Sequence, residues 1–182
     1  MGKLHAGIDD DLRSWIAAQR VFFVATAPSG EGGHVNCSPK GGDALAVVGP
    51  NEVAYLDRAG SGIETVAHVQ QNGRIVVMLC AFDGAPRIVR LHGRGEVVRR
   101  TDPRFAALRA HFPGPELGAR AIVRVVLSRI SDSCGFGVPR YRYEGERDQL
   151  GKWCEKKGAA GVDAYVREKN ARSIDGLPGL DG

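Results

Sequence analysis

The sequence predicts a mainly β, α+β fold, in which a small antiparallel β barrel carries flanking helices. First, short apolar runs follow one another and are separated by turns rich in glycine and proline, which is typical of consecutive hairpins. Second, helical patterns lie mostly at the edges of this β-rich stretch, so the β-α-β alternation of a doubly wound parallel sheet is missing. Third, closing an antiparallel sheet into a barrel removes its exposed edges.

The size and composition of the chain fit one globular domain, which we place at residues 1–182. A chain of 182 residues can bury a sizeable core, and 43% hydrophobic with 25% charged residues is an ordinary globular balance. No apolar run approaches the roughly 20 residues that cross a bilayer. The N-terminus lacks the apolar core of a secretory signal. We therefore expect a soluble, cytoplasmic protein without membrane association.

Metal and nucleic-acid binding are both disfavoured by the residue pattern. The four cysteines lie far apart without metal-ligand spacing, and the five histidines are scattered along the chain. We expect the cysteines to be reduced and mostly buried. The formal net charge is only +4, and basic residues are mixed with acidic ones instead of forming a stripe. A basic barrel that binds nucleic acid is therefore the third of three hypotheses.

Two predicted hairpins open the β-rich stretch. The apolar run "VFFVATA" at 21–27 is followed by a turn and by "HVNCSPKG" at 34–41, which returns as its partner. A second hairpin pairs residues 44–49 with residues 53–58. The returning segment begins like a strand and then breaks into proline and glycine around Lys40. Either the strand simply runs into a turn there, or an anionic group lies where the strand ends.

The later strands are predicted at 74–82, 87–100 and 120–131. With the four hairpin strands they make seven strand patterns, from which we expect a barrel of about six strands. The strand at 87–100 alternates between apolar and polar residues, so its two faces should differ. We expect one face to carry Val89, Leu91 and Val97, and the other to carry Arg90, His92 and Arg94.

Helices are predicted before, within and after the strands. Residues 9–19 have aspartates in the first turn and an apolar face, which favours a helix. Residues 61–73 follow, with Ser61 as the expected cap, Glu64 three residues later, and Gly73 as the stop. A further helix is expected at 102–112. From about residue 140 we expect a helical C-terminal extension, with helices at 146–157 and 161–170.

One segment, "LDRAGSGIET" at 56–65, has the features of a phosphate site. Backbone N–H groups at the start of a helix can hold a phosphate, and Ser61 and Thr65 would add hydroxyl donors. Arg58 can form a bidentate contact, and Lys40 could supply a second positive charge. The alternative is an ordinary capped helix beside solvated basic residues. The motifs of serine hydrolases, phosphate loops and zinc proteases are missing from the sequence.

The order of three segments resembles a known family. "VNCSPKG" at 35–41, "AYLDRAGSGIETVAHVQQNGRIVVMLC" at 54–80 and "RIVRLHGRGEVV" at 87–98 are similar to the pyridoxamine 5′-phosphate oxidase-like family of flavin-binding split barrels. The resemblance covers roughly residues 20–135. The C-terminal part from Trp153 onwards looks like the extension of an uncharacterised bacterial subgroup.

This resemblance implies a six-stranded split barrel that forms a homodimer with two FMN molecules at the subunit interface. In relatives, one strand presents its backbone to the flavin ring and a lysine follows it, while the next strand end and helix start bind the ribityl phosphate. The implied cofactor-binding residues are Val35, Asn36, Cys37, Ser38, Lys40, Arg58, Ser61 and Thr65. Some relatives bind a deazaflavin or haem instead. The segment "SCGFGVP" at 133–139 is expected to reach the partner's flavin, since glycine allows close approach.

The chain also departs from the vitamin oxidase. The Ser-Arg-Lys phosphate clamp of that enzyme is replaced by Ser61-Gly62-Ile63, and Glu64 would repel a phosphate if it pointed inward. True pyridoxamine phosphate oxidation is therefore not expected. The first hypothesis is an FMN-dependent oxidoreductase that acts on an unidentified small molecule, with no acid or base assignable. The second is a non-catalytic protein that binds a flavin, a deazaflavin or haem.

Overall fold

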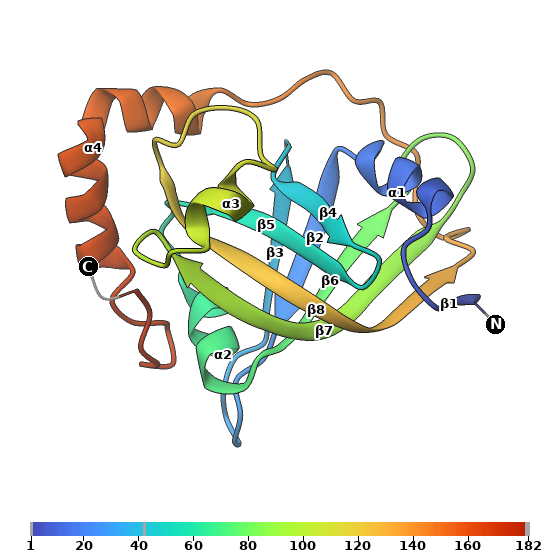
Figure 1. Ribbon diagram of the computed structural model, residues 1–182, viewed down its shortest axis with the longest axis horizontal. Helices are drawn as coiled ribbons and strands as arrows, with labels where there is room; N and C mark the ends of the chain where they lie inside the picture. Colours follow the sequence, from blue (N-terminus) through green and yellow to red (C-terminus); the bar gives the residue numbers. More distant parts are fainter. Residues whose placement is uncertain (1, 42, 181–182) are drawn as a thin grey trace.

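The computed structural model describes residues 2–41 and 43–180, and these form one antiparallel sheet with helices around it (Figure 1). The strands are β1 (Leu4–His5), β2 (Val21–Thr26), β3 (Asn36–Gly41), β4 (Leu45–Gly49), β5 (Glu52–Arg58), β6 (Arg74–Cys80), β7 (Ile88–Arg99) and β8 (Ala119–Ser133). The helices are α1 (Asp10–Ala17), α2 (Glu64–Asn72), α3 (Phe105–Arg109) and α4 (Gln149–Lys169).

The sheet is curled into a barrel that is split along one side. Its strand order is β3-β2-β6-β7-β8-β5-β4, and the short β1 pairs with the far end of β8. Strands β3 and β4 are the two ends of this order, so within residues 2–41 and 43–180 no backbone ladder joins β3 to the β4–β5 side. The fold confirms the predicted antiparallel split barrel with flanking helices, and it places the split beside β3.

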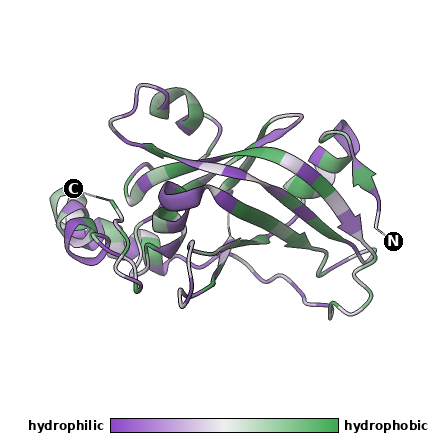
Figure 2. Ribbon diagram, turned by 90° about the horizontal axis from the view of Figure 1, so that it is seen from below, coloured by the Kyte–Doolittle hydropathy of each residue, from purple (hydrophilic) through white to green (hydrophobic). Residues whose placement is uncertain are grey.

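The barrel core is built from the inward faces of β2, β6 and β7. Alternate residues of a strand face opposite sides, and every second residue is buried in β2, in most of β6 and in the first part of β7. The buried side chains from these strands are Phe22, Val24, Ile75, Val77, Leu79, Val89 and Leu91. Figure 2 shows the hydrophobic residues concentrated on the strands. Helix α1 closes one end of the barrel with Leu12 and Ile16.

The predicted alternation of β7 agrees with the packing. Val89 and Leu91 are buried and Val97 packs against the same core, while Arg94 is exposed on the other face. Val98 also lies on that other face but is buried beneath α3. Gly95 allows close packing, because a β-carbon there would lie 3.1 Å from a methyl group of Val69.

Strand β3 begins two residues later than the predicted partner strand at 34–41, and it continues through the proline and the lysine. Pro39 pairs opposite Phe23 and Lys40 opposite Phe22, so the segment does not turn before Gly41. Proline is tolerated because β3 is an edge strand and one side of its backbone needs no ladder partner. In the described part of the chain the sheet has eight strands against the expected six, because all seven predicted strand segments pair in it and β1 is added. The added β1 has only two residues, which is too short for a recognisable sequence pattern.

The predicted cap of α2 is wrong. The helix begins at Glu64, Ile63 occupies the cap position, and no side chain forms a capping hydrogen bond. Ser61 therefore lies outside the helix, because two further residues separate it from the first turn. The predicted stop is correct, since Gly73 adopts the left-handed conformation with φ 71°.

The C-terminal part contains an extended segment before its helix. Residues 134–148, which we call the strap, contain no helix and lead from β8 across one side of the barrel to α4 (Figure 1). The predicted helices merge into α4, which is broken at Gly158. No helix in the described ranges is long and apolar enough to cross a membrane.

After α4 the chain folds back onto α2. Residues 171–180, which we call the tail, end at Leu180, whose side chain is buried against Ile63 and Val66. The side-chain amide of Gln70 on α2 donates to the carbonyls of Pro178 and Gly179. The tail is thus an integral part of the packed domain.

Candidate cofactor site at the split of the barrel

Strand β3 presents polar side chains to the split of the barrel. Asn36, Ser38 and Lys40 are partly buried, whereas Cys37 and Pro39 between them are exposed. This alternation follows from the pleat of a strand, in which successive side chains point to opposite faces. Val35 precedes the strand and is 75% exposed. The inward row therefore contains three of the predicted cofactor-binding residues.

A line of polar contacts crosses the split. The amide of Asn36 donates to the Thr65 hydroxyl at 2.9 Å, and the Ser38 hydroxyl donates to Asn36 Oδ1 at 3.3 Å. Lys40 Nζ lies 3.2 Å from Asp57 Oδ1. We call these five residues the seam. They connect β3 to α2 and β5 where the backbone ladder is interrupted.

Asp57 is the buried centre of a wider network. Its side chain is 1% exposed, and Arg120 Nε on β8 lies 2.7 Å from its second oxygen. Arg120 also donates to Asn170 Oδ1 at 2.7 Å, and the Asn170 amide donates to the Gly60 carbonyl at 2.9 Å. Burial alone would raise the pKa of Asp57, but Arg120 and Lys40 hold it below its ordinary value. Two cations share one carboxylate, so the cluster has a net positive charge.

Two buried polar atoms near the seam lack a hydrogen-bond partner among the described residues. They are Tyr55 Oη and His68 Nε2. The other ring nitrogen of His68 lies 3.0 Å from the Thr26 hydroxyl. Burial and the nearby Asp57 raise the pKa of Tyr55 well above its ordinary value, and burial lowers the pKa of His68. Both side chains are therefore uncharged at neutral pH, and each keeps hydrogen-bonding capacity that no described residue uses.

Two cavities lie at opposite ends of β3. The smaller, which we call the helix-start cavity, has a volume of about 390 Å³ and is lined by residues 34–36, Ser61, Gly62, Glu64 and Ile174. The larger, which we call the strap cavity, has a volume of about 1320 Å³. Arg58, Gly41, Tyr141 and Tyr143 are among its lining residues.

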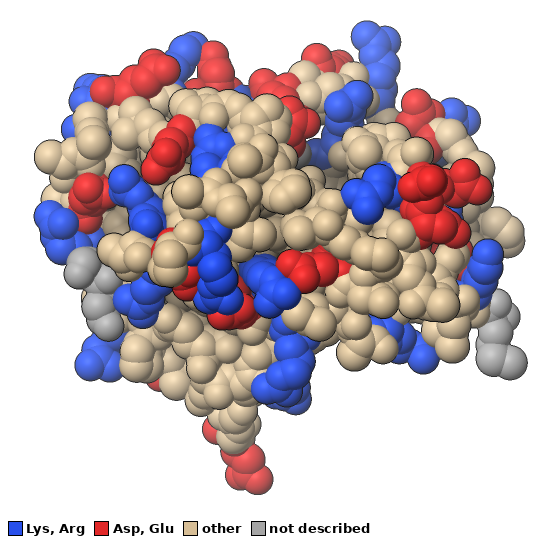
Figure 3. Space-filling view, viewed as in Figure 1, with Lys and Arg blue, Asp and Glu red and all other residues tan. Residues whose placement is uncertain are grey.

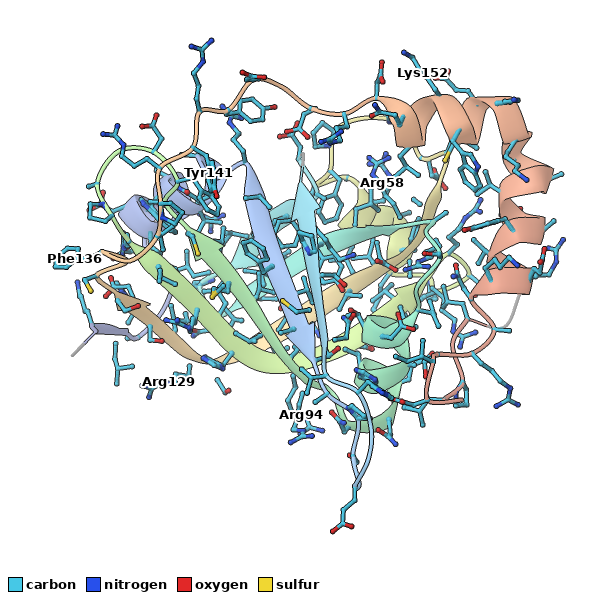
Figure 4. All side chains as sticks on the ribbon, turned by 180° about the vertical axis from the view of Figure 1, so that it is seen from behind. Arg58, Arg94, Arg129, Phe136, Tyr141 and Lys152 are labelled. Carbon is cyan, nitrogen blue, oxygen red and sulfur yellow. The ribbon has the colours of Figure 1, made fainter. Side chains whose placement is uncertain are left out.

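Arg58 does not lie with the other predicted phosphate ligands. It follows Asp57 on β5 and lines the strap cavity, with a guanidinium nitrogen 3.9 Å from where a side chain on Gly114 would begin. Figure 4 shows it on the strap side of the barrel, toward the start of α4 where Lys152 lies. Ser61 instead lines the helix-start cavity, and Thr65 lies in the seam. The structure thus separates Arg58 from Ser61 and Thr65.

The cysteines, the metal-binding residue types and the surface charges are distributed as follows. Cys80 and Cys154 are buried, but Cys37 and Cys134 are exposed, so the cysteines are not mostly buried. Within the described ranges, no group of three His, Cys, Asp or Glu residues could hold a metal ion. On the face drawn in Figure 3, basic and acidic side chains are interspersed.

The fold and the seam define an antiparallel split-barrel protein with a polar site along its split. Two solved structures share this fold. HupZ of Group A Streptococcus superposes with a TM-score of 0.53 at 17% identity, covering 68% of this chain and 91% of HupZ. A candidate pyridoxamine 5′-phosphate oxidase of Lactobacillus delbrueckii gives 0.54 at 16% identity, covering 71% of this chain and 98% of that protein.

Sequence comparison identifies the family. The family model "Pyridoxamine 5′-phosphate oxidase" matches residues 8–134. The pyridoxamine 5′-phosphate oxidase family protein ustO of Aspergillus flavus is 40% identical over 192 residues, covering 97% of this chain and 77% of ustO. The chain belongs to the pyridoxamine 5′-phosphate oxidase family, which confirms the resemblance seen in its motifs.

Proposed function

We propose that this protein is an FMN-dependent oxidoreductase that acts on a small molecule. The observation that carries the proposal is the seam. In a member of the pyridoxamine 5′-phosphate oxidase family, partly buried polar side chains follow the edge strand β3. Among the described residues, two buried polar atoms nearby, Tyr55 Oη and His68 Nε2, lack a hydrogen-bond partner. Buried polar atoms without partners are rare in folded proteins, and a bound ligand is one way to satisfy them.

The residues of the seam fit the ring of a flavin. One edge of that ring presents alternating hydrogen-bond donors and acceptors, and the free edge of β3 offers backbone groups of both kinds. Asn36, Ser38 and Thr65 add an amide and two hydroxyls on the same side. The residues that would hold the ring are the backbone of Val35, Asn36, Cys37 and Ser38 together with these side chains.

The positive charges near the Gly41 end of β3 fit the phosphate of FMN. Lys40 shares Asp57 with Arg120, so part of its charge remains available to an anion. Arg58 lines the strap cavity together with Gly41, the residue after Lys40. Hydrogen bonds from such cations to phosphate oxygens are stronger than those between neutral groups.

A bound flavin supplies the electron-transfer chemistry, and the protein positions the substrate and tunes the ring. In this chain the polar seam would orient the ring, and the buried side chain of Tyr55, whose ring lies beside Lys40, would exclude water from one side. Tyr55 and His68 remain uncharged at neutral pH and can donate or accept hydrogen bonds there. No side chain is assigned as a general acid or base.

We also propose that the protein is a homodimer. The outward face of β2 and β6 carries the partly exposed apolar residues Phe23, Ala25, Val76 and Met78. Cys37 and Pro39 of β3 are exposed on the same side of the sheet. A second copy would cover this face. Phe136 in the strap is 81% exposed and is labelled in Figure 4, which suits a segment that reaches a partner. The proposed location is the cytoplasm.

A non-catalytic protein that binds a flavin, a deazaflavin or haem is the second candidate function. The ion pair between Lys40 and Asp57 favours this second candidate, because neither group is free to act as an acid or a base in the structure. Anaerobic mixing of the flavin-loaded protein with NAD(P)H, or with a reduced deazaflavin, separates the two functions. Bleaching of the flavin by a reductant supports the oxidoreductase. A bound flavin that neither donor reduces supports the binding protein.

A further inference from the structure

The start of α2 is already occupied by an acidic side chain. Glu64 is the first residue of the helix, where the helix dipole favours a negative charge. Its carboxylate folds back over the preceding loop, because Oε2 would lie 2.5 Å from a β-carbon placed on Gly62. The other oxygen accepts a hydrogen bond from the backbone N–H of Ile174 at 3.3 Å.

The tail holds this arrangement in place. Asp175 accepts a hydrogen bond from the backbone N–H of His34 at 2.9 Å, and its other oxygen lies 2.6 Å from His34 Nδ1. These hydrogen bonds lower the pKa of Asp175. With Leu180 buried against α2, the tail joins the start of β3 to the start of α2. Ile174 lines the helix-start cavity, and its backbone is held to Glu64 at the start of α2.

The helix-start cavity has no lysine or arginine among the described residues that line it. Its single basic side chain, His34, is already paired with Asp175. A phosphate placed there would meet the Glu64 carboxylate without a cation to offset the repulsion. Lys40 is four residues from Asn36, or about 13 Å along the strand. The cations of the site therefore lie at the other end of β3.

We infer that the start of α2 is not a phosphate site in this chain. The helix-start cavity accepts an uncharged part of the ligand, and Glu64, held by the tail, excludes anions from it. If the ligand is FMN, its phosphate lies toward the Gly41 end of β3, where Arg58 lines the strap cavity. This inference rests on the proposed flavin site and assigns the direction in which the ligand lies.

Riboflavin and FMN provide the test, because they differ only in the phosphate. The dissociation constant of riboflavin divided by that of FMN reports the contribution of the phosphate alone. Both constants are measured by quenching of flavin fluorescence. Arg58→Ala should bring this ratio down by about tenfold, the loss expected for one charge-assisted contact. Glu64→Gln and Ser61→Ala should leave it within about twofold of the wild-type ratio. Glutamine keeps an oxygen for the Ile174 N–H, so only the charge is removed.

The opposite pattern would overturn the inference: a ratio that changes about fivefold or more in Glu64→Gln or Ser61→Ala, and not in Arg58→Ala. Glu116→Gln, an exposed residue that does not line this cavity, is the matched control. If neither flavin binds, the proposed function fails, and inorganic pyrophosphate then tests the inference by thermal unfolding. No stabilisation, or stabilisation lost in Arg58→Ala, supports it. Stabilisation lost in Ser61→Ala contradicts it.

Discussion

The ammonium group of Lys40 lies 3.2 Å from a carboxylate oxygen of Asp57, and this ion pair joins the edge strand β3 to β5 across the split of the barrel. Among the described residues no ladder of backbone hydrogen bonds crosses the split, and side-chain contacts such as this pair connect its two sides. Lys40 also lies 5.3 Å from the centre of the Tyr55 ring, which adds a cation–π contact. Stability and ligand binding are therefore linked at this pair.

Asp57→Asn should destabilise the protein strongly. The substitution leaves Lys40 and the largely buried Arg120 without a counter-charge, and breaking a buried pair in this way costs about 3–5 kcal/mol. Urea unfolding followed by circular dichroism measures the change in the free energy of unfolding. Glu116→Gln, which removes an exposed charge, should change it by less than about 0.5 kcal/mol. A similar stability of the two variants would show that the buried network does not hold the split together.

Stability at low pH should depend on Asp57. Its pKa in the folded protein lies below the ordinary value of 3.8 because Arg120 and Lys40 outweigh the effect of burial. A lowered pKa means that the ionised group stabilises the fold fully above about pH 4, and that this contribution is lost as pH falls through the lowered pKa. The wild-type protein should therefore lose more stability between about pH 5 and pH 2 than Asp57→Asn. Parallel pH profiles of the two proteins would contradict this assignment.

Arg58→Ala and Lys40→Ala should have different effects. Arg58 lines a cavity, so its removal should weaken FMN binding by roughly ten- to a hundredfold while the free energy of unfolding barely changes. Lys40 is part of the buried network, so Lys40→Ala should lower both stability and affinity, with the smaller effect on affinity. Flavin fluorescence and urea unfolding measure the two quantities on the same samples. Unchanged affinity in both variants would remove these cations from the cofactor site.

The outward face of β2 and β6 should mediate dimerisation. Phe23→Glu places a charge in the centre of this apolar face, and burying an unpaired charge in an interface is costly. Light scattering at micromolar concentration should show a dimer for the wild-type protein and a monomer for this variant. Leu4→Glu on β1, at the far end of β8 and also exposed, should remain a dimer. A wild-type monomer would contradict the proposed assembly.

Local patterns were sufficient for the barrel and most of its helices. Alternation identified the buried residues of β7, and Gly73 marked the end of α2 because its conformation has a positive φ. The position of Arg58 has no such signal. Arg58 and Asp57 are neighbours on β5, but the register with β8 shifts between them, and Arg58 lines the strap cavity while Asp57 lies in the seam.

Other parts of the site have no local signal. Arg120 and Asn170 are 50 positions apart, and only the folded chain brings them together beside Asp57 and Gly60. The tail has the composition of a loop, and its contacts with His34 and Glu64 span more than 100 positions. Contacts of this kind depend on the packing of α4 and the tail against the barrel, which no periodicity of the tail itself encodes.

The visible absorption spectrum of the purified protein, recorded before and after addition of FMN and removal of unbound flavin, tests the central claim most directly. The account predicts the two visible bands of an oxidised flavin that stays with the protein. Asn36→Leu should lose most of this absorbance while remaining folded, since it removes the contact between β3 and Thr65. A wild-type protein that is colourless and remains colourless with excess FMN would contradict the account.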